Sequence, residues 1–544
     1  MSDYTPPTQD MQFTLEDVLG FTHEELDSET ITAILDEASK LARDELAPLN
    51  SSGDQHGARI DTQTGDVTTA PGFKDAYANY RDGGWNAVPF DPDYGGQCLP
   101  WAIAFPVQEM WQGANMSFGL CPLLNQGAVE AISAHGSQDL KDTYLENLIS
   151  GQWTGTMNLT EPQAGSDLGL LSAKAIPNDD DTFKISGQKI FITYGDHDMA
   201  DNIIHLVLAR LPDAPDDVKG ISLFVVPKFL PDSGARNAVK CIGLEHKLGI
   251  HASPTCTMDF DGATGFIVGE PHMGLKYMFT MMNNARLSVG LQGVAIAERA
   301  YQHALSYAQE RVQGKSADTG ERVSIDHHPD VKRMLLEMRS CTETGRALTY
   351  QAALALDSGD ELVHLLTPLV KSWCTDMSVS VASLGIQVHG GMGFIEETGA
   401  AQYMRDARIL PIYEGTNGIQ AADLVFRKIL RDQGTLALRY IGELKDNMSP
   451  DHQDDVQPYL NDLTDLIKAI GAHKDINALS FAAKPCLDAF ALIAGACLLS
   501  RSAIAVQSHS DPDFAAKKIE SITFFIQHIL PRAHGHLISA RHSL

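Results

Sequence analysis

The sequence predicts an α+β multidomain protein in which a β-rich middle segment separates two helical parts of the chain. Apolar residues recur with helical spacing up to about residue 150, alternate in strand fashion over the next segment, and return to helical spacing after Gly274. The chain has 544 residues, of which 44% are hydrophobic, so it can build several cores. We expect an N-terminal helical domain over 1–153, a middle β domain over 154–272, a C-terminal four-helix-bundle domain over 273–435 and an additional C-terminal helical domain over 436–544.

The first two domains contain short periodic segments bounded by glycine and proline. Helices are predicted over 31–49, which ends near Pro48, and over 101–112 and 127–135. The strands of the middle domain are predicted from short apolar, β-branched runs between turn residues, at 183–187, 203–209, 221–226, 258–260 and 266–268. Such a series of short strands is typical of a small barrel or sandwich.

The last two domains are predicted to be helical throughout. The helix after Gly274 has one apolar face, formed by Leu287, Leu291, Val294, Tyr301, Leu305, Ala308 and Val312. Further helices are predicted over 330–356, 361–385 and 417–431, and the acidic stretch 451–455 after Pro450 predicts a linker before a final helical section. The apolar run 489–499 is too short to cross a bilayer, so it predicts a buried helix and we expect no membrane insertion.

Charge and cysteine content restrict the classes of partner and compartment. The formal net charge of −29 argues against general nucleic-acid binding. The eight cysteines are scattered without a CxxC pair, which predicts buried thiols in a reducing compartment, and we expect no metal site. The segment Met1-Ser2-Asp3-Tyr4 lacks the basic and apolar regions of a signal peptide, so we expect a cytoplasmic protein.

The run Tyr413–Gln420, with sequence Tyr-Glu-Gly-Thr-Asn-Gly-Ile-Gln, places one carboxylate directly before a turn into a helix. Asn417, three residues ahead of Gln420, has the spacing of a helix N-cap with a capping box. A carboxylate such as Glu414, beside amides that the helix does not use, is a candidate general base. Taken alone, however, the run is better explained as a loop glutamate in front of a capped helix.

Three further motifs carry small residues, hydroxyls and glycines that can lie against a flat ring or a phosphate. They are Thr-Glu-Pro-Gln-Ala-Gly-Ser-Asp at 160–167, Phe-Ile-Thr at 191–193 and Gly-Gly-Met-Gly at 390–393. The glycines do not form GxGxxG after a strand, so a Rossmann domain is not predicted.

The order of these motifs resembles the acyl-CoA dehydrogenase family over about residues 30–431. The series also includes Tyr-Gly-Gly at 94–96, the helix that carries Arg286, Arg-Asp-Ala-Arg at 405–408 and Tyr-Glu-Gly-Thr at 413–416. Within the family, the chain is most similar to the 3-methylmercaptopropionyl-CoA dehydrogenase branch. That similarity lies in the segments 11–13, 157–160, 245–253 and 281–286 and in the extra C-terminal section.

The resemblance implies an FAD-dependent enzyme that oxidises an acyl-CoA thioester to the trans-2-enoyl-CoA. A base removes the α-proton while the β-hydride passes to flavin N5. Glu414 matches that base, and Ala285 stands where some members carry the base instead. The branch suggests conversion of 3-methylmercaptopropionyl-CoA to methylthioacryloyl-CoA, a step of dimethylsulfoniopropionate catabolism, while medium-chain or other straight-chain acyl-CoA substrates stay open. An electron-transfer flavoprotein is the expected electron acceptor, and a homodimer or homotetramer is the expected assembly.

The resemblance also assigns positions around the catalytic base. Those that match FAD contacts in the family are Thr160, Ser166, Phe191, Thr193, Arg311, Gln387, Gly390, Gly391, Thr416 and Gly418. Among them, Arg311, Gln387, Gly390 and Gly391 correspond to residues that reach the FAD of a neighbouring subunit. Those that match substrate contacts are Ser166, Asn283, Arg286, Tyr413 and Gly415. Phe191 replaces a tryptophan found in many relatives, and Asn283 replaces a frequent aspartate.

Two alternative functions remain at the level of sequence. An acyl-CoA oxidase of the same fold would pass its electrons to oxygen, and the motifs do not separate it from a dehydrogenase. A flavin-bearing, DNA-associated protein would need a basic C-terminal surface. Residues 436–544 contain 10 Lys and Arg against 12 Asp and Glu, which does not predict such a surface.

Overall fold

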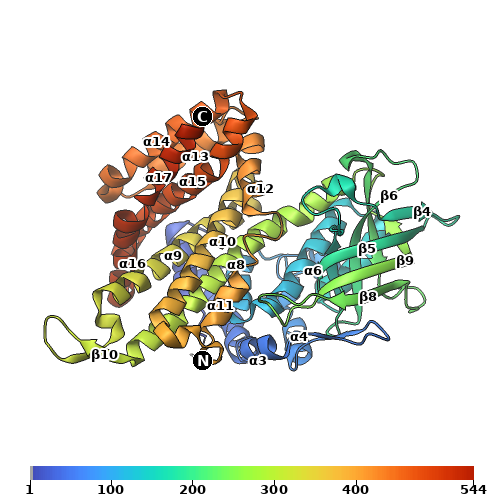
Figure 1. Cartoon of the computed structure of the whole chain (residues 1–544), viewed down its shortest axis with the longest axis horizontal. Coiled ribbons are helices and arrows are strands. Elements are labelled where there is room, and N and C mark those ends of the chain that lie inside the picture. The colour runs from blue at the N-terminus through green and yellow to red at the C-terminus, as the bar shows by residue number, and fades with distance from the viewer. Residues whose placement is uncertain (1–3) are drawn as a thin grey trace. The chain divides into compact units, whose positions relative to one another are not determined.

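The computed structural model describes residues 4–544 and confirms the predicted order of a helical segment, a β segment and a long helical segment (Figure 1). Of the N-terminal segment used above to infer the compartment, Met1, Ser2 and Asp3 lie outside these residues. The chain forms two compact units. The first contains the residues up to Arg43, then Trp101–Ala114 and Arg286–Leu544, and the second contains Asp44–Pro100 and Asn115–Ala285.

The first unit is helical apart from one small hairpin. Its helices before the C-terminal section are α1 (Thr8–Phe13), α2 (Ser28–Leu41), α5 (Trp101–Ala114), the greater part of α8 (Gly274–Glu310), α9 (Pro329–Asp357), α10 (Leu362–His389), α11 (Ala400–Ala407) and α12 (Asn417–Ala422). Short π-helical turns extend α2 over Ala42–Leu46 and α12 over Asp423–Ile429. The long helices α8, α9 and α10 lie side by side in the first unit (Figure 1).

The C-terminal section adds a second group of helices to the first unit (Figure 1). These are α13 (Thr435–Asn447), α14 (Gln453–Ala472), α15 (Ile476–Ala505), α16 (Pro512–Phe524) and α17 (Arg532–Ser543). The predicted linker at 451–455 is wrong, because a 3-10 turn (Pro450–His452) leads directly into α14. Asp454 and Asp455 lie in the first turn of that helix, where carboxylates interact favourably with the helix dipole.

One further helical prediction is wrong, and the prediction of a buried helix around residue 490 is confirmed over a longer segment. Val312 does not continue the apolar face of α8, because the chain leaves the helix after Glu310 and forms a hairpin of β10 (Val312–Lys315) and β11 (Arg322–Ser324). The apolar run near residue 490 belongs to a longer segment, Ile476–Ser508, which is long and apolar enough to cross a membrane by length and composition. Since 83% of the most apolar stretch of this segment is buried, the segment is typical of a core helix.

The second unit combines helices with a β-barrel. Its helices are α3 (Leu49–His56), α4 (Phe73–Asp82), α6 (Met116–His135) and α7 (Gln138–Ser150). Its strands are β1 (Arg59–Ile60), β2 (Val67–Thr68), β3 (Trp153–Asn158), β4 (Lys174–Pro177), β5 (Phe183–Thr193), β6 (Asn202–Arg210), β7 (Ile221–Pro227), β8 (Val239–Leu244) and β9 (Thr255–Ile267). β1 and β2 form a separate hairpin.

The seven larger strands form one sheet that closes on itself. The order β6-β4-β5-β9-β7 returns to β6 through antiparallel β6–β7 pairing, while β3 adds to β6 in parallel and β8 adds to β9. The barrel alternative is therefore correct. The two strands predicted at 258–260 and 266–268 are one strand, β9, because Gly262, at φ 72°, lets the chain pass through a register shift opposite Ile185 and Ser186 without ending the strand.

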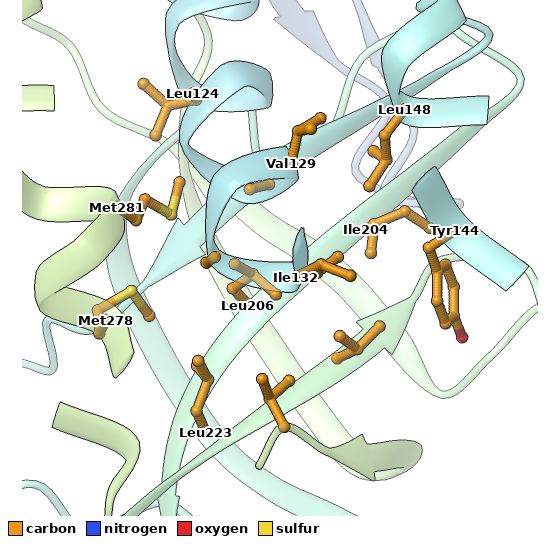
Figure 2. Close-up of a cluster of buried hydrophobic side chains, with 14 of the residues drawn as sticks. Leu124, Val129, Ile132, Tyr144, Leu148, Ile204, Leu206, Leu223, Met278 and Met281 are labelled. Carbon is orange, nitrogen blue, oxygen red and sulfur yellow. The ribbon is translucent and has the colours of Figure 1, made fainter. Parts of the chain in front are cut away.

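A hydrophobic core joins the barrel to the helices of the second unit (Figure 2). Leu124, Val129 and Ile132 of α6 share this core with Leu206 of β6 and Leu223 of β7, and Ile132 lies next to Leu206. Other members of this core come from α7 and from the start of α8, among them Tyr144, Leu148, Met278 and Met281. The barrel is thus anchored to α6 and α7 by buried apolar area.

The predicted state of the cysteines is confirmed. All eight are free thiols, and only Cys98 is exposed.

A buried arginine connects helices of the first unit that are far apart in the sequence. Arg346 of α9 donates to Asp10 of α1 (2.6 Å), to Glu109 of α5 (2.6 Å) and to Glu298 of α8 (2.9 Å). Lys518 of α16 also pairs with Asp10, which ties the C-terminal section to the same cluster. Burial opposes a charged guanidinium, but the three carboxylates hold the pKa of Arg346 well above its ordinary value.

We expect Arg346→Met to lower the free energy of unfolding by about 3–5 kcal/mol, because it leaves buried carboxylates without their partner. Urea-induced unfolding of the purified protein measures this loss. Arg333→Met on the same helix is the control, since the side chain of Arg333 is 48% exposed in its ion pair with Asp330 and its removal should cost about 1 kcal/mol or less. Equal losses in the two variants would show that the cluster does not stabilise the unit.

Candidate active site

The predicted base lies on a short turn between α11 and α12, which we call the base loop (residues 413–417). Glu414 has φ 54° and Gly415 has φ 87°, so two consecutive residues occupy the left-handed region. Only glycine adopts this conformation freely, and a glutamate there must be held by its surroundings. The turn leaves the Glu414 side chain partly buried.

The N-cap of α12 is Thr416, so the prediction of Asn417 as the cap is wrong. The Thr416 hydroxyl accepts a hydrogen bond from the N–H of Ile419 (3.4 Å). Asn417 is the first helical residue and is buried, because its side chain is bound by α10. Its amide donates to the carbonyl of Ser372 (3.1 Å) and to the hydroxyl of Thr375 (3.0 Å). A polar pattern that fits a capping box is here used to attach the loop to a neighbouring helix.

Lys371 of α10 also binds the base loop. Its ammonium group donates to the carbonyl oxygen of Gly415 (2.8 Å) and to Oδ1 of Asn417 (3.0 Å). The side chain is completely buried. Lys371 was missed by the sequence motifs, although it is a lone cation in an apolar stretch of helix, which is itself a signal of a specific buried contact.

Residues from α8 and α12 hold the other side of the base loop. Arg286 Nε donates to the carbonyl oxygen of Glu414 (3.4 Å), and Gln420 Nε2 donates to that of Gly415 (3.2 Å). The Tyr413 hydroxyl donates to Gln292 of α8. Gln292 is a second residue that the sequence motifs did not indicate. Predicted site residues Arg286, Tyr413, Glu414 and Gly415 are therefore brought together in the first unit, and each backbone carbonyl at the left-handed turn has a donor.

The surroundings of Glu414 bring the pKa of its carboxyl close to neutral pH. Burial raises its pKa to about 7, and the positive charges of Arg286 and Lys371 oppose that rise. Burial also lowers the pKa of Lys371 to about 7, against the attraction of Glu414 and Asp376. A carboxyl with this pKa is divided between its two protonation states near pH 7, as a general base that works at that pH should be.

The predicted flavin-side residues of the second unit lie around the end of β3 and the end of β5. Thr160 and Ser166 are on the loop that follows β3, with Ser166 exposed, and Phe191 and Thr193 are at the end of β5. The Phe191 side chain is 57% exposed, and its backbone has φ 61°. An exposed aromatic ring thus lies at the end of β5, two residues before Thr193.

A buried ion pair that the sequence analysis did not single out fixes the loop after β3. Lys189 Nζ donates to the carboxylate of Glu161 (2.8 Å) and to the carbonyl of Leu159 (3.0 Å). Burial would raise the pKa of Glu161, but Lys189 and the hydrogen bonds from Ser172 hold it at about 2. The pair therefore fixes the backbone on both sides of Thr160.

The remaining predicted positions are all exposed. Arg311 directly follows α8, and Gln387, Gly390 and Gly391 are at the end of α10; all four are exposed. Asn283 is exposed on α8, in contrast to the buried Arg286 one turn further along. Gly418 is exposed in the first turn of α12, close to Thr416. Their expected contacts stay predictions.

The imidazole ring of His251 is held by other protein groups rather than left free for a ligand. Both of its ring nitrogens are engaged, Nδ1 with Asp54 (2.8 Å) and Nε2 with the carbonyl of Lys247 (2.9 Å).

Comparison with known protein families covers nearly the whole chain. The acyl-CoA dehydrogenase N-terminal, middle and C-terminal domain profiles match residues 28–152, 156–263 and 272–429. A fourth profile, "Acetyl-CoA dehydrogenase C-terminal like", matches residues 442–543, which contain most of the extra helical section.

Individual relatives agree with these matches. A 3-methylmercaptopropionyl-CoA dehydrogenase of Ruegeria pomeroyi is 50% identical over 80% of this chain and 78% of its own length. A butyryl-CoA dehydrogenase of Syntrophomonas wolfei is 34% identical over 93% of this chain and 90% of its own. The structure of Caenorhabditis elegans ACDH-11 in complex with C11-CoA has a similar fold, with a TM-score of 0.82 and 21% identity over 97% of this chain and 93% of that one. The chain belongs to the acyl-CoA dehydrogenase family.

Proposed function

We propose that this acyl-CoA dehydrogenase oxidises 3-methylmercaptopropionyl-CoA to methylthioacryloyl-CoA, and that Glu414 removes the α-proton. One observation carries the role of Glu414: its carboxyl has a pKa of about 7 and sits on a turn in which the carbonyls of Glu414 and Gly415 both accept hydrogen bonds. The choice of substrate is supported by the name of the 50% identical relative from Ruegeria pomeroyi. A butyryl-CoA dehydrogenase at 34% identity is the competing guide to the acyl group.

The family depends on FAD, and the residues of the second unit fit a flavin. The hydroxyls of Thr160, Ser166 and Thr193 make no side-chain hydrogen bond within residues 4–544, so they can bond to the cofactor. The exposed ring of Phe191 offers a flat apolar surface of the kind that an isoalloxazine ring requires. When bound, FAD supplies the acceptor for the β-hydride.

The base loop offers both groups that proton removal requires. The α-proton of a thioester becomes acidic enough only when its carbonyl oxygen is stabilised by donors. Within the described chain no hydrogen bond uses the N–H of Glu414, whereas the N–H of Tyr413 is bonded to Ile409 (3.1 Å). The Glu414 N–H can therefore bind the thioester oxygen while the carboxylate of the same residue takes the proton.

The partners follow from the same proposal. The exposed residues Arg311, Gln387, Gly390 and Gly391 reach the FAD of a second copy in a homodimer or homotetramer. An electron-transfer flavoprotein in the cytoplasm accepts the electrons. Peroxide formation equal to substrate consumption in air would instead identify an oxidase.

Glu414→Gln should retain FAD and lower kcat by about 10²–10⁴-fold, because the amide keeps the shape of the side chain but cannot accept the proton. Anaerobic reduction of the flavin by substrate, followed by absorbance, measures the loss. Glu361→Gln is the control, since that glutamate is 68% exposed at the start of α10. Full activity of Glu414→Gln would remove Glu414 from the mechanism.

A panel of acyl-CoA substrates should show the highest kcat/KM for 3-methylmercaptopropionyl-CoA, followed by short straight chains. Pentanoyl-CoA is the matched control because it replaces the sulfur by a methylene group. We expect it to be within about tenfold, since an apolar pocket discriminates poorly between near-isosteres. A higher kcat/KM for chains of about ten carbons or more would contradict the proposed substrate.

A further inference from the structure

Lys371 has an unusual position for a lysine. It lies in α10 among apolar residues, and its side chain has no exposed surface. A lysine is rarely buried unless its ammonium group has specific partners. The two groups that accept hydrogen bonds from the Lys371 ammonium, the carbonyl of Gly415 and the side chain of Asn417, belong to the base loop. The ammonium group of Lys371 therefore stabilises the base loop through hydrogen bonds.

The loop needs such an anchor because of its backbone conformation. Glu414 and Gly415 both have positive φ, and a glutamate is strained in this region. If Gly415 were displaced, the direction of the Glu414 carboxylate would change with it. Lys371 holds the carbonyl that follows the strained residue and also holds Asn417, where α12 begins. The two ends of the turn are thereby fixed to one rigid helix.

Lys371 also contributes to the charge balance around the base. The groups that interact with Glu414 are Arg286 of α8 and Lys371 itself. Asp376 of α10 faces Lys371, while Asp423 and Arg427, which follow α12, face Arg286. A cation beside a carboxyl stabilises its ionised form and lowers its pKa. Lys371 thus opposes the effect of burial on Glu414.

We propose that Lys371 is a positioning residue for the catalytic base: its buried ammonium group fixes the left-handed turn at Glu414 and Gly415, and its charge favours the ionised carboxylate. This inference rests on the proposed role of Glu414. It adds a requirement that the base loop alone does not contain, namely a cation supplied from α10.

The test is α-proton exchange in deuterated water, measured on the full-length FAD-loaded enzyme with acetyl-CoA as the probe. Acetyl-CoA has α-protons but no β-hydrogen, so exchange reports proton removal without hydride transfer. The rate is followed by mass spectrometry from about pH 5.5 to about pH 9, which brackets the expected titration. Because the base must be ionised, wild-type exchange should be lost as the pH falls through about 7, the pKa of Glu414.

Lys371→Met and Lys371→Gln should move this acid limb upward by about one pH unit, because removal of the cation favours the protonated carboxyl. Exchange at pH 7 should fall about fivefold or more in both variants. Lys371→Gln keeps a hydrogen-bond donor without the charge, so it gives the pH profile if Lys371→Met does not fold. An unchanged midpoint in the folded variants would overturn the inference.

Lys228→Met is the matched control for the loss of a buried lysine. Lys228 pairs with Asp196 (3.0 Å) in the second unit, so its replacement should reduce stability and leave the midpoint in place. An equal shift in Lys228→Met would also overturn the inference. Glu414→Gln separates the two proposals: persistent exchange in that variant would contradict the proposed base, whereas loss of exchange there with an unmoved Lys371 profile would contradict only the positioning role.

Discussion

The burial of Arg346 among carboxylates is the constraint on which the first unit depends. A guanidinium can be buried only if acceptors surround it, and here the acceptors come from α1, α5 and α8. These contacts fix α8 against α9, and α10 packs on α9 in turn. The base loop is braced by Arg286 and Gln292 of α8 on one side and by Lys371 of α10 on the other. The helices that hold the base loop are therefore themselves positioned through a charge cluster in a different part of the same unit.

Periodicity and motif order were sufficient to predict the order of the helical and β segments and the family, whereas the role of Glu414 stays a proposal. The long helices have apolar faces at helical spacing, and the barrel strands have short β-branched runs between turns, so local pattern and final structure agree. The wrong predictions occur where a contact with a distant part of the chain overrides the local sequence pattern. Asn417 fits a capping box, yet α10 binds its side chain. Residues 258–268 read as two strands because Asp261 and Gly262 are turn residues, yet pairing with β5 continues through them.

The supporting residues of the site could not be predicted for a different reason. Lys371 is 44 residues from Gly415, and Lys189 is 28 residues from Glu161. No spacing rule connects such pairs, because the contact exists only after the helices or strands have packed. Sequence shows a single buried-looking cation in an apolar segment, which indicates that a partner exists but not which one. The proposed base lies in a sequence motif, whereas Lys371, which binds its loop, is recognised only from the fold.

Burial raises the pKa of Glu414, and the neighbouring positive charges lower it. The position of Glu414 in the loop exposes its carboxyl to both effects. Burial alone would make the carboxyl too reluctant to ionise at neutral pH, while nearby cations alone would make the carboxylate a weak base. The loop places one residue where both effects operate, and the N–H of that residue has no hydrogen-bond partner within residues 4–544. In the proposed mechanism this arrangement acts at the α-carbon and the carbonyl, which every acyl-CoA shares. Selection among acyl groups must therefore come from residues that contact the distal end of the chain, so the base loop can be common to relatives that differ in substrate.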